Sequence, residues 1–109
     1  MEERIAIEVE RLLEIFKDIS PEEMAITKNI IERVAFMQVT LEDMERDIKA
    51  NGTTELTKTF PRKVRERPVV KSYNAMIKNY NGTLKQLFAK TPTGKSSEAD
   101  DELLRWLKR

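Results

Sequence analysis

The sequence contains neither cysteine nor histidine among its 109 residues. Without cysteine the chain has no disulfide framework, no thiolate metal ligand and no cysteine nucleophile, and it fits a reducing compartment. Without histidine it lacks the commonest general base and the commonest protein ligand for metals. A glycine-rich phosphate loop and a serine-based triad are also missing. We therefore expect a protein that is not an enzyme and that carries no cofactor and no metal.

Long apolar runs are absent too, and nothing approaches the roughly 18–20 apolar residues that cross a membrane. The first four residues, Met1 to Arg4, are acidic and do not begin a signal peptide. We expect an intracellular protein with no membrane partner. Apolar residues make up 39% and charged residues 36% of this single-domain chain, against about 45–50% and 25% in typical domains. Little core is available per residue, which favours helices that share a core between subunits.

The net charge of +1 hides an uneven distribution. Residues 1–50 hold 13 acids and 7 bases, residues 51–97 hold 2 acids and 10 bases, and residues 98–109 hold 4 acids and 3 bases. The middle of the chain is therefore strongly basic, whereas the first half is acidic.

Apolar residues at three- and four-residue spacing predict an all-α fold built on a long helical hairpin. The predicted helices cover about residues 3–18, 21–50 and 68–89. Ser20 is a good N-cap and Pro21 suits the first helical position, so a sharp turn is expected between the first two helices. Asn51-Gly52 is a usual signal for the end of a helix.

The segment that joins the second and third helices lacks a helical period. We predict an irregular basic loop over residues 51–67, in which Thr53 to Phe60 is a candidate strand of a hairpin that turns at Pro61. Asn81-Gly82 lies inside the third helix, but the apolar register continues across it, so we predict one helix. Gly82 would allow close backbone packing there.

A short helix is predicted at the end of the chain. Residues 91–97 are rich in proline, glycine, serine and threonine and predict a linker between a helical domain, residues 1–90, and a helix at 98–109 that Ser97 can cap. So short a segment is not stable alone, and it must dock on its own domain or bind a partner. The residues predicted for partner binding are Leu103, Leu104, Trp106 and Leu107.

Six bases gathered within fourteen residues make the first candidate site. The residues predicted to contact double-stranded DNA are Lys58, Arg62, Lys63, Arg65, Arg67 and Lys71. Contacts of such residues with phosphates give affinity without sequence information and weaken steeply as salt rises. Phe60 beside them can stack or wedge against DNA, or it can anchor the loop to the core. The alternative is a solvated loop that balances the acidic helices of a neighbouring subunit.

The second helix carries a seven-residue repeat over three heptads. Its predicted length is about 45 Å, whereas a compact chain of 100 residues has a radius of gyration of about 13 Å. We predict that this face forms a homo-oligomer, with the alternative that half of it packs within the chain. The predicted oligomerisation residues are Ile30, Val34, Met37, Leu41, Met44 and Ile48.

Four acids also crowd this helix at Glu42, Asp43, Glu45 and Asp47. A divalent metal takes about six oxygen ligands, and no second acidic element stands at a suitable spacing. We therefore predict a solvated charged face and not a metal site.

Part of the sequence resembles a known protein family. The run Ala50-Asn51-Gly52-Thr53-Thr54, the basic loop, and the stretches from Glu66 to Met76 and from Lys85 to Phe88 are similar to short small subunits of phage DNA-packaging terminases. In that family a long helix ends at a similar Asn/Gly signal and is followed by a variable loop and a proline-started amphipathic helix. The resemblance covers roughly residues 30–95.

The resemblance implies a ring-forming homo-oligomer in the cytoplasm of a bacterial host. Such a ring recognises the packaging site of the viral DNA and regulates the large subunit, which carries the ATPase and nuclease. The basic loop would contact DNA, the long helix would build the ring, and the tail with Trp106 would engage the large subunit. Many small terminases read DNA with an N-terminal helix-turn-helix, but residues 1–50 are acidic here, so we place the DNA surface in the basic loop.

Two other functions fit the same sequence. A helical protein–protein adaptor of phage origin would not bind DNA, and its basic loop would meet an acidic protein surface. A small DNA-binding repressor would form a dimer and not a ring. Duplex DNA binding at low salt and the mass of the particle in solution separate the three.

Overall fold

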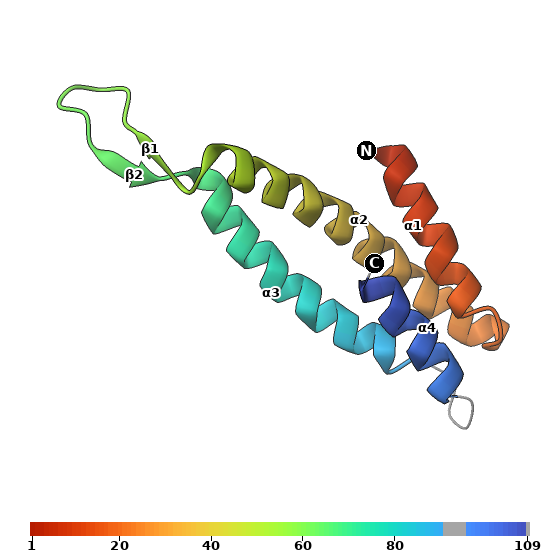
Figure 1. Cartoon of the computed structure of the whole chain (residues 1–109). Helices are drawn as coiled ribbons and strands as arrows, with labels where there is room; N and C mark the ends of the chain where they lie inside the picture. Colours follow the sequence, from red (N-terminus) through yellow and green to blue (C-terminus); the bar gives the residue numbers. More distant parts are fainter. Residues whose placement is uncertain (91–95, 109) are drawn as a thin grey trace.

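The computed structural model of the protein describes residues 1–90 and 96–108. Its elements, in chain order, are α1 (Glu2–Ile15), α2 (Pro21–Asn51), β1 (Thr54–Leu56), β2 (Val64–Glu66), α3 (Pro68–Phe88) and α4 (Ser96–Lys108) (Figure 1). The predicted all-α fold with a long helical hairpin and a short C-terminal helix is confirmed, and the sheet consists only of the antiparallel pair β1–β2.

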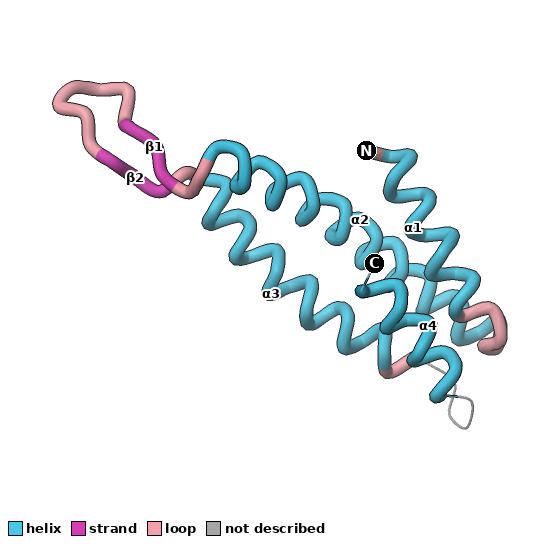
Figure 2. The backbone as a smooth tube through the Cα atoms, viewed as in Figure 1, coloured by secondary structure: helices cyan, strands magenta, loops and turns pink. Residues whose placement is uncertain are grey.

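The molecule is a rod. Its principal extents are 62 × 24 × 23 Å and its radius of gyration is 17.7 Å, above the roughly 13 Å of a compact chain of 100 residues. α2 and α3 lie side by side and antiparallel, and the β-strands extend beyond their shared end (Figure 2). α1 and α4 lie at the opposite end, which we call the base because all four helices meet there.

The tight turn between α1 and α2 is confirmed. Ser20 is extended, with φ −63° and ψ 155°, and its Oγ accepts a hydrogen bond of 3.2 Å from the backbone N–H of Glu23. Pro21 occupies the start of the helix, where its missing N–H costs nothing. α1 ends at Ile15, three residues before the predicted end, because Phe16 leaves the helix and is fully buried in the core.

α3 continues through Gly82, which confirms one helix across the Asn-Gly pair. The close packing that Gly82 would allow does not occur within the described part of the chain, because a Cβ built there would meet no other atom within 4 Å. α2 ends as predicted at Gly52, whose φ of 79° lies in the left-handed region that favours glycine.

The core lies at the base. Its fully buried large side chains come from every helix: Leu12, Phe16, Ile31, Val34, Leu87 and Leu103. Burying one such side chain contributes about 1.5–3 kcal/mol relative to leaving it exposed. α1 and α4 therefore close over the base half of the α2–α3 pair, and the other half projects as a two-helix stalk.

α4 begins at Ser96, two residues earlier than predicted, and residues 91–95 of the predicted linker lie outside the described residues. Among the described helices, none has both the length and the hydropathy that a transmembrane span requires.

Candidate nucleic-acid interface

The predicted irregular loop is wrong in part, because residues 54–66 form a β-hairpin. The strands pair Thr54 with Glu66, Glu55 with Arg65, and Leu56 with Val64. The candidate strand at Thr53 to Phe60 is thus shorter than expected. Threonine and valine favour this extended pairing, but two strands of three residues leave almost no periodic signal in the sequence.

A clamp joins the hairpin to the end of α2. The Arg67 guanidinium donates to both carboxylate oxygens of Asp47, at 2.9 and 3.1 Å, and to the Gly52 carbonyl oxygen at 2.8 Å. Asn51 also donates to Asp47, at 2.7 Å. These hydrogen bonds, first from Asn51 and then from Arg67, hold the pKa of Asp47 below its usual value. The hairpin therefore leaves the helices in a fixed direction.

The far end of the hairpin is closed by Thr57 and Lys63. The Thr57 N–H donates to the Lys63 carbonyl oxygen at 2.8 Å, and the Lys63 N–H donates to Thr57 Oγ1 at 3.0 Å. We call residues 58–62, which these two bonds enclose, the tip. It consists of Lys58, Thr59, Phe60, Pro61 and Arg62, and the Phe60–Pro61 peptide is cis.

The structure divides the six predicted DNA-contact residues into two groups. Arg65 is paired across the strands with Glu55, its Nε donating at 2.7 Å, and Arg67 is held in the clamp with only 18% of its side chain exposed. The other four have exposed side chains with no ion pair to any described residue: Lys58, Arg62, Lys63 and Lys71. The two paired arginines stabilise the hairpin, and the side chains of the four other residues are exposed to solvent.

Phe60 does not anchor the hairpin to the core. Its side chain is 93% exposed at the end of the rod, about as open as a side chain in an unfolded chain. Leu56 and Val64, which face each other across the strands, are also exposed. The tip thus presents an aromatic ring between two cations, Lys58 and Arg62, with apolar surface behind it.

The four carboxylates of the acidic face on α2 are half-exposed, as a solvated face requires, but each is also bound to another group of the chain. Arg4 of α1 donates to Asp43 at 2.6 Å and to Glu42 at 3.1 Å, and the Arg4 hydrogen bond lowers the pKa of Asp43. Glu45 accepts from the Tyr73 hydroxyl at 2.8 Å, which raises the pKa of Tyr73. These contacts tie α2 to α1 and α3. No cluster of three or more metal-binding side chains occurs among the described residues.

The residues predicted for oligomerisation lie mostly inside this chain. Val34, Met37 and Leu41 are buried in its own core, and Ile30 packs against it. Met44 and Ile48 are half-buried further along α2. The alternative, packing against the other helices of the same chain, therefore accounts for the centre of the heptad face.

Two exposed apolar side chains of α2 were not among the residues predicted from the sequence. Ile26 is 55% and Phe36 47% exposed, and helical spacing puts both on one face together with Arg33. Neither fits the heptad register of the buried face. Their position outside this register was the sequence signal that could have predicted their exposure.

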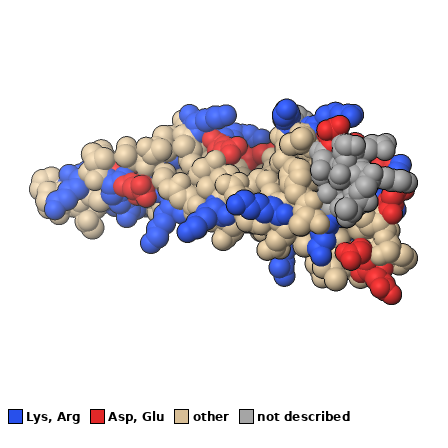
Figure 3. All heavy atoms as spheres, turned by 90° about the horizontal axis from the view of Figure 1, so that it is seen from below, with Lys and Arg blue, Asp and Glu red and all other residues tan. Residues whose placement is uncertain are grey.

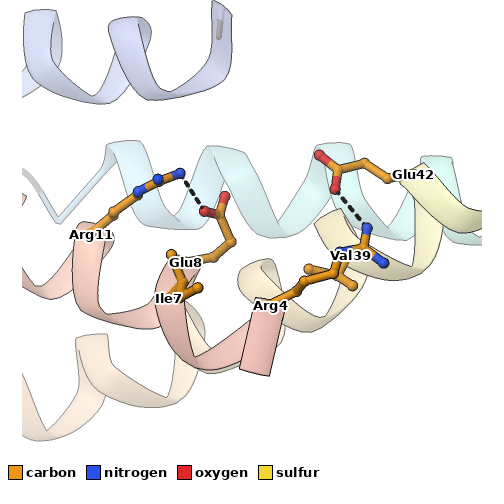
Figure 4. A pocket seen from close by; sticks show the side chains of 6 residues that line it. All are labelled: Arg4, Ile7, Glu8, Arg11, Val39 and Glu42. Carbon is orange, nitrogen blue, oxygen red and sulfur yellow. Dashed lines mark hydrogen bonds and ion pairs between the residues drawn. The ribbon is translucent and has the colours of Figure 1, made fainter. Parts of the chain in front are cut away.

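A surface groove of about 380 Å³ lies between α1 and α2, with Val39 at its floor (Figure 4). Its charged walls are paired, since Arg11 donates to Glu8 at 2.9 Å and Arg4 donates to Glu42 (Figure 4). The ionic side chains that line this groove therefore bind one another.

The four residues predicted for partner binding are divided between core and surface. Leu103 is fully buried and Trp106 is 6% exposed, both within the core of the base. Leu107 packs partly against that core, and Leu104 is exposed. α4 is therefore docked on its own domain, the alternative to partner binding.

No protein-family model matches this sequence, and no curated protein or solved structure matches it significantly. A function for the chain must therefore be inferred from its own geometry and charge.

Proposed function

We propose that this chain is the non-catalytic small subunit of a phage terminase, and that it binds double-stranded DNA through its projecting hairpin. In this role it assembles with further copies of itself into a ring in the cytoplasm of the bacterial host. It binds the viral DNA at the packaging site and recruits or regulates the large ATPase and nuclease subunit.

One observation carries this proposal: a clamped hairpin at the end of a 62 Å rod presents Lys58, Arg62 and Lys63 around an exposed Phe60. Cations that have no acidic partner in the described chain are available to phosphates, and their binding releases the counterions of DNA. An exposed aromatic ring that does nothing for the core is suited to stacking on bases or wedging between them.

Exposed apolar side chains are present for the two protein–protein contacts of the proposed assembly, between copies and with the large subunit. A contact between copies would use apolar groups that the chain does not bury itself, such as Ile26 and Phe36 on α2. Exposed apolar side chains of this kind are common in protein interfaces. A contact with the large subunit would use Leu104, the most exposed of the apolar residues in α4 that were predicted for it.

The test is the salt dependence of duplex DNA binding, measured by fluorescence anisotropy. Arg62→Gln/Lys63→Gln removes two tip charges, so the slope of log affinity against log salt should fall by about 2. The matched control is Lys28→Gln/Arg33→Gln, which removes two exposed charges from α2 near its N-terminus. This control should leave the slope unchanged.

Other outcomes decide against the proposal. A reduced slope in the control with an unchanged slope in the tip variant would place DNA at the α1–α2 turn, as in a helix-turn-helix protein. If the wild-type chain fails to bind long duplex DNA at low salt, DNA binding is excluded and a helical protein–protein adaptor is the better account.

A further inference from the structure

We propose that the outer face of α3 is a second DNA-contact surface, which continues from the hairpin so that the duplex lies along the rod. This inference rests on the proposed DNA-binding function and adds the path of the DNA. Of the residues involved, only Lys71 was predicted from the sequence as a DNA contact.

Three lysines form a straight row on α3. Lys71, Lys78 and Lys85 are spaced by seven residues, which is close to two helical turns. Successive lysines are therefore about 10.5 Å apart along one face, and the row is about 21 Å long. All three side chains are exposed, and within the described chain none of them forms an ion pair.

No acid weakens the field of this row from within its own helix, because residues 67–90 contain neither aspartate nor glutamate. The acids of α2 nearest to α3 point into the contact between the two helices, where Glu45 binds Tyr73 and Asp47 binds Arg67. Seen from the side on which α3 lies, basic side chains extend from the hairpin along the rod, and acidic side chains lie at the base and in smaller groups at the hairpin and near the middle of the rod (Figure 3).

Small residues stand beside the lysines. Ala75 and Gly82 are also seven residues apart and lie on the same exposed face. Gly82 costs about 1 kcal/mol of helix stability relative to alanine, and no contact in the described chain requires it, because a Cβ there would meet nothing within 4 Å. Close approach of a DNA backbone to the helix at this point accounts for a glycine in the middle of α3.

The surface fits a polyanion better than a protein. Interfaces between proteins have an apolar core, and charged residues are depleted there. The α3 face offers no large apolar side chain, since its exposed residues are lysines, asparagines and small residues: Lys71, Asn74, Ala75, Lys78, Asn81, Gly82 and Lys85. Duplex DNA presents one negative charge per about 1.7 Å of its axis, so every lysine in the row can find a phosphate.

The first experiment uses the full-length chain and a duplex of 30 base pairs or so, long enough to extend beyond the 62 Å rod at about 3.4 Å per pair. Lys78→Gln/Lys85→Gln should reduce the salt slope of log affinity by about 2 and leave the thermal midpoint of unfolding unchanged. Arg105→Gln/Lys108→Gln, with the same charge change on exposed residues of α4, should keep the wild-type slope.

A second variant separates contact from stability. Gly82→Gln should raise the midpoint of unfolding, because glutamine is a better helix former than glycine, and it should weaken DNA binding, because its side chain stands where the backbone approaches. A merely structural role for this face predicts the rise in stability without the loss of affinity.

The outcomes distinguish this inference from the proposed function. If Arg62→Gln/Lys63→Gln lowers the salt slope and Lys78→Gln/Lys85→Gln does not, the α3 contact is wrong and the hairpin function stands. If the wild-type chain does not bind the duplex, both fail. If Lys78→Gln/Lys85→Gln instead lowers the mass of the particle in solution and keeps the salt slope, the face binds an acidic surface of a second copy and the inference is overturned.

Discussion

The base and the hairpin end of this rod differ in the exposure of their large apolar side chains and in the pairing of their charged ones. At the base, large apolar side chains such as Phe16 and Trp106 are buried, and Lys90 is paired with Glu23 at the start of α2. At the hairpin end, Phe60 is exposed and the neighbouring cations have no acidic partner in the described chain. Side chains at the base stabilise the fold, whereas those at the tip contribute little to it, and this contrast marks the tip as a contact surface. Four predictions test this comparison, from the largest expected effect to the smallest.

The largest effect should come from the base. Trp106→Ala removes a buried indole and should lower the free energy of unfolding by about 3–5 kcal/mol, measured by urea denaturation. Trp106 is the only tryptophan, so the emission of the wild-type protein should be that of a buried indole. A solvent-like emission spectrum together with a small loss of stability would show that α4 is not docked.

The corresponding change at the tip should affect binding and not stability. Phe60→Ala should change the free energy of unfolding by less than about 0.5 kcal/mol, as surface substitutions usually do. Its affinity for duplex DNA should fall by about 1–3 kcal/mol, the worth of one aromatic stack on a base. Leu104→Ala removes another exposed apolar side chain and serves as the control. Equal DNA affinities of the Phe60 variant and the wild type would rule out a stacking role.

Replacing two threonines by valine should have different effects at the base and at the hairpin. Thr27 is fully buried at the base, and its Oγ1 has no hydrogen-bond partner among the described residues. Because burying an unpaired hydroxyl is costly, Thr27→Val should stabilise the fold by about 1 kcal/mol. Thr57→Val removes the oxygen that accepts from the Lys63 N–H and should speed hydrogen exchange of that amide without changing global stability. A destabilised Thr27 variant would indicate a partner for its hydroxyl.

The smallest effect concerns the clamp and depends on pH. The pKa of Asp47 is lowered in the folded chain, so its contribution to stability is present above its unfolded pKa of about 3.9 and is lost as the pH falls through the folded value. Asp47→Asn should therefore destabilise the hairpin at pH 6 and make little difference at pH 2. Amide hydrogen exchange at Arg67, whose N–H donates to the Thr53 carbonyl oxygen, reports on this end of the hairpin. An equal effect at both pH values would contradict an ionic clamp.

The sequence predicted what depends on local patterns. The helices, the Ser20 cap and the stop at Gly52 follow from spacing and capping chemistry within a few residues. The β-hairpin was predicted only as a candidate strand that turns at Pro61 within an irregular loop, because strands of three residues have no readable period. The predicted interface of α2 failed to distinguish a partner in the same chain from a partner in another, since apolar spacing is the same for both.

The sequence predicted which basic residues form the candidate site, but not which of them are paired or how exposed Phe60 is. Six bases near one another are visible in the sequence, but the partner of Arg67 is twenty residues away in α2, and only the fold brings Asp47 to it. The exposure of Phe60 was equally beyond a sequence pattern, because the residue also fitted an anchoring role. The lysine row on α3 was visible, since Lys71, Lys78 and Lys85 repeat every seven residues. It was not predicted as a site because lysines spaced along a helix are also typical of an ordinary solvated face.

Amide chemical shifts recorded by NMR during a titration with duplex DNA test the division between tip and base most directly. The account predicts shifts at the tip, at Lys63 and along the lysine row of α3, with the amides of α1 and of the α1–α2 turn unchanged. Shifts concentrated around Lys28 and Arg33, with the hairpin unaffected, would contradict it.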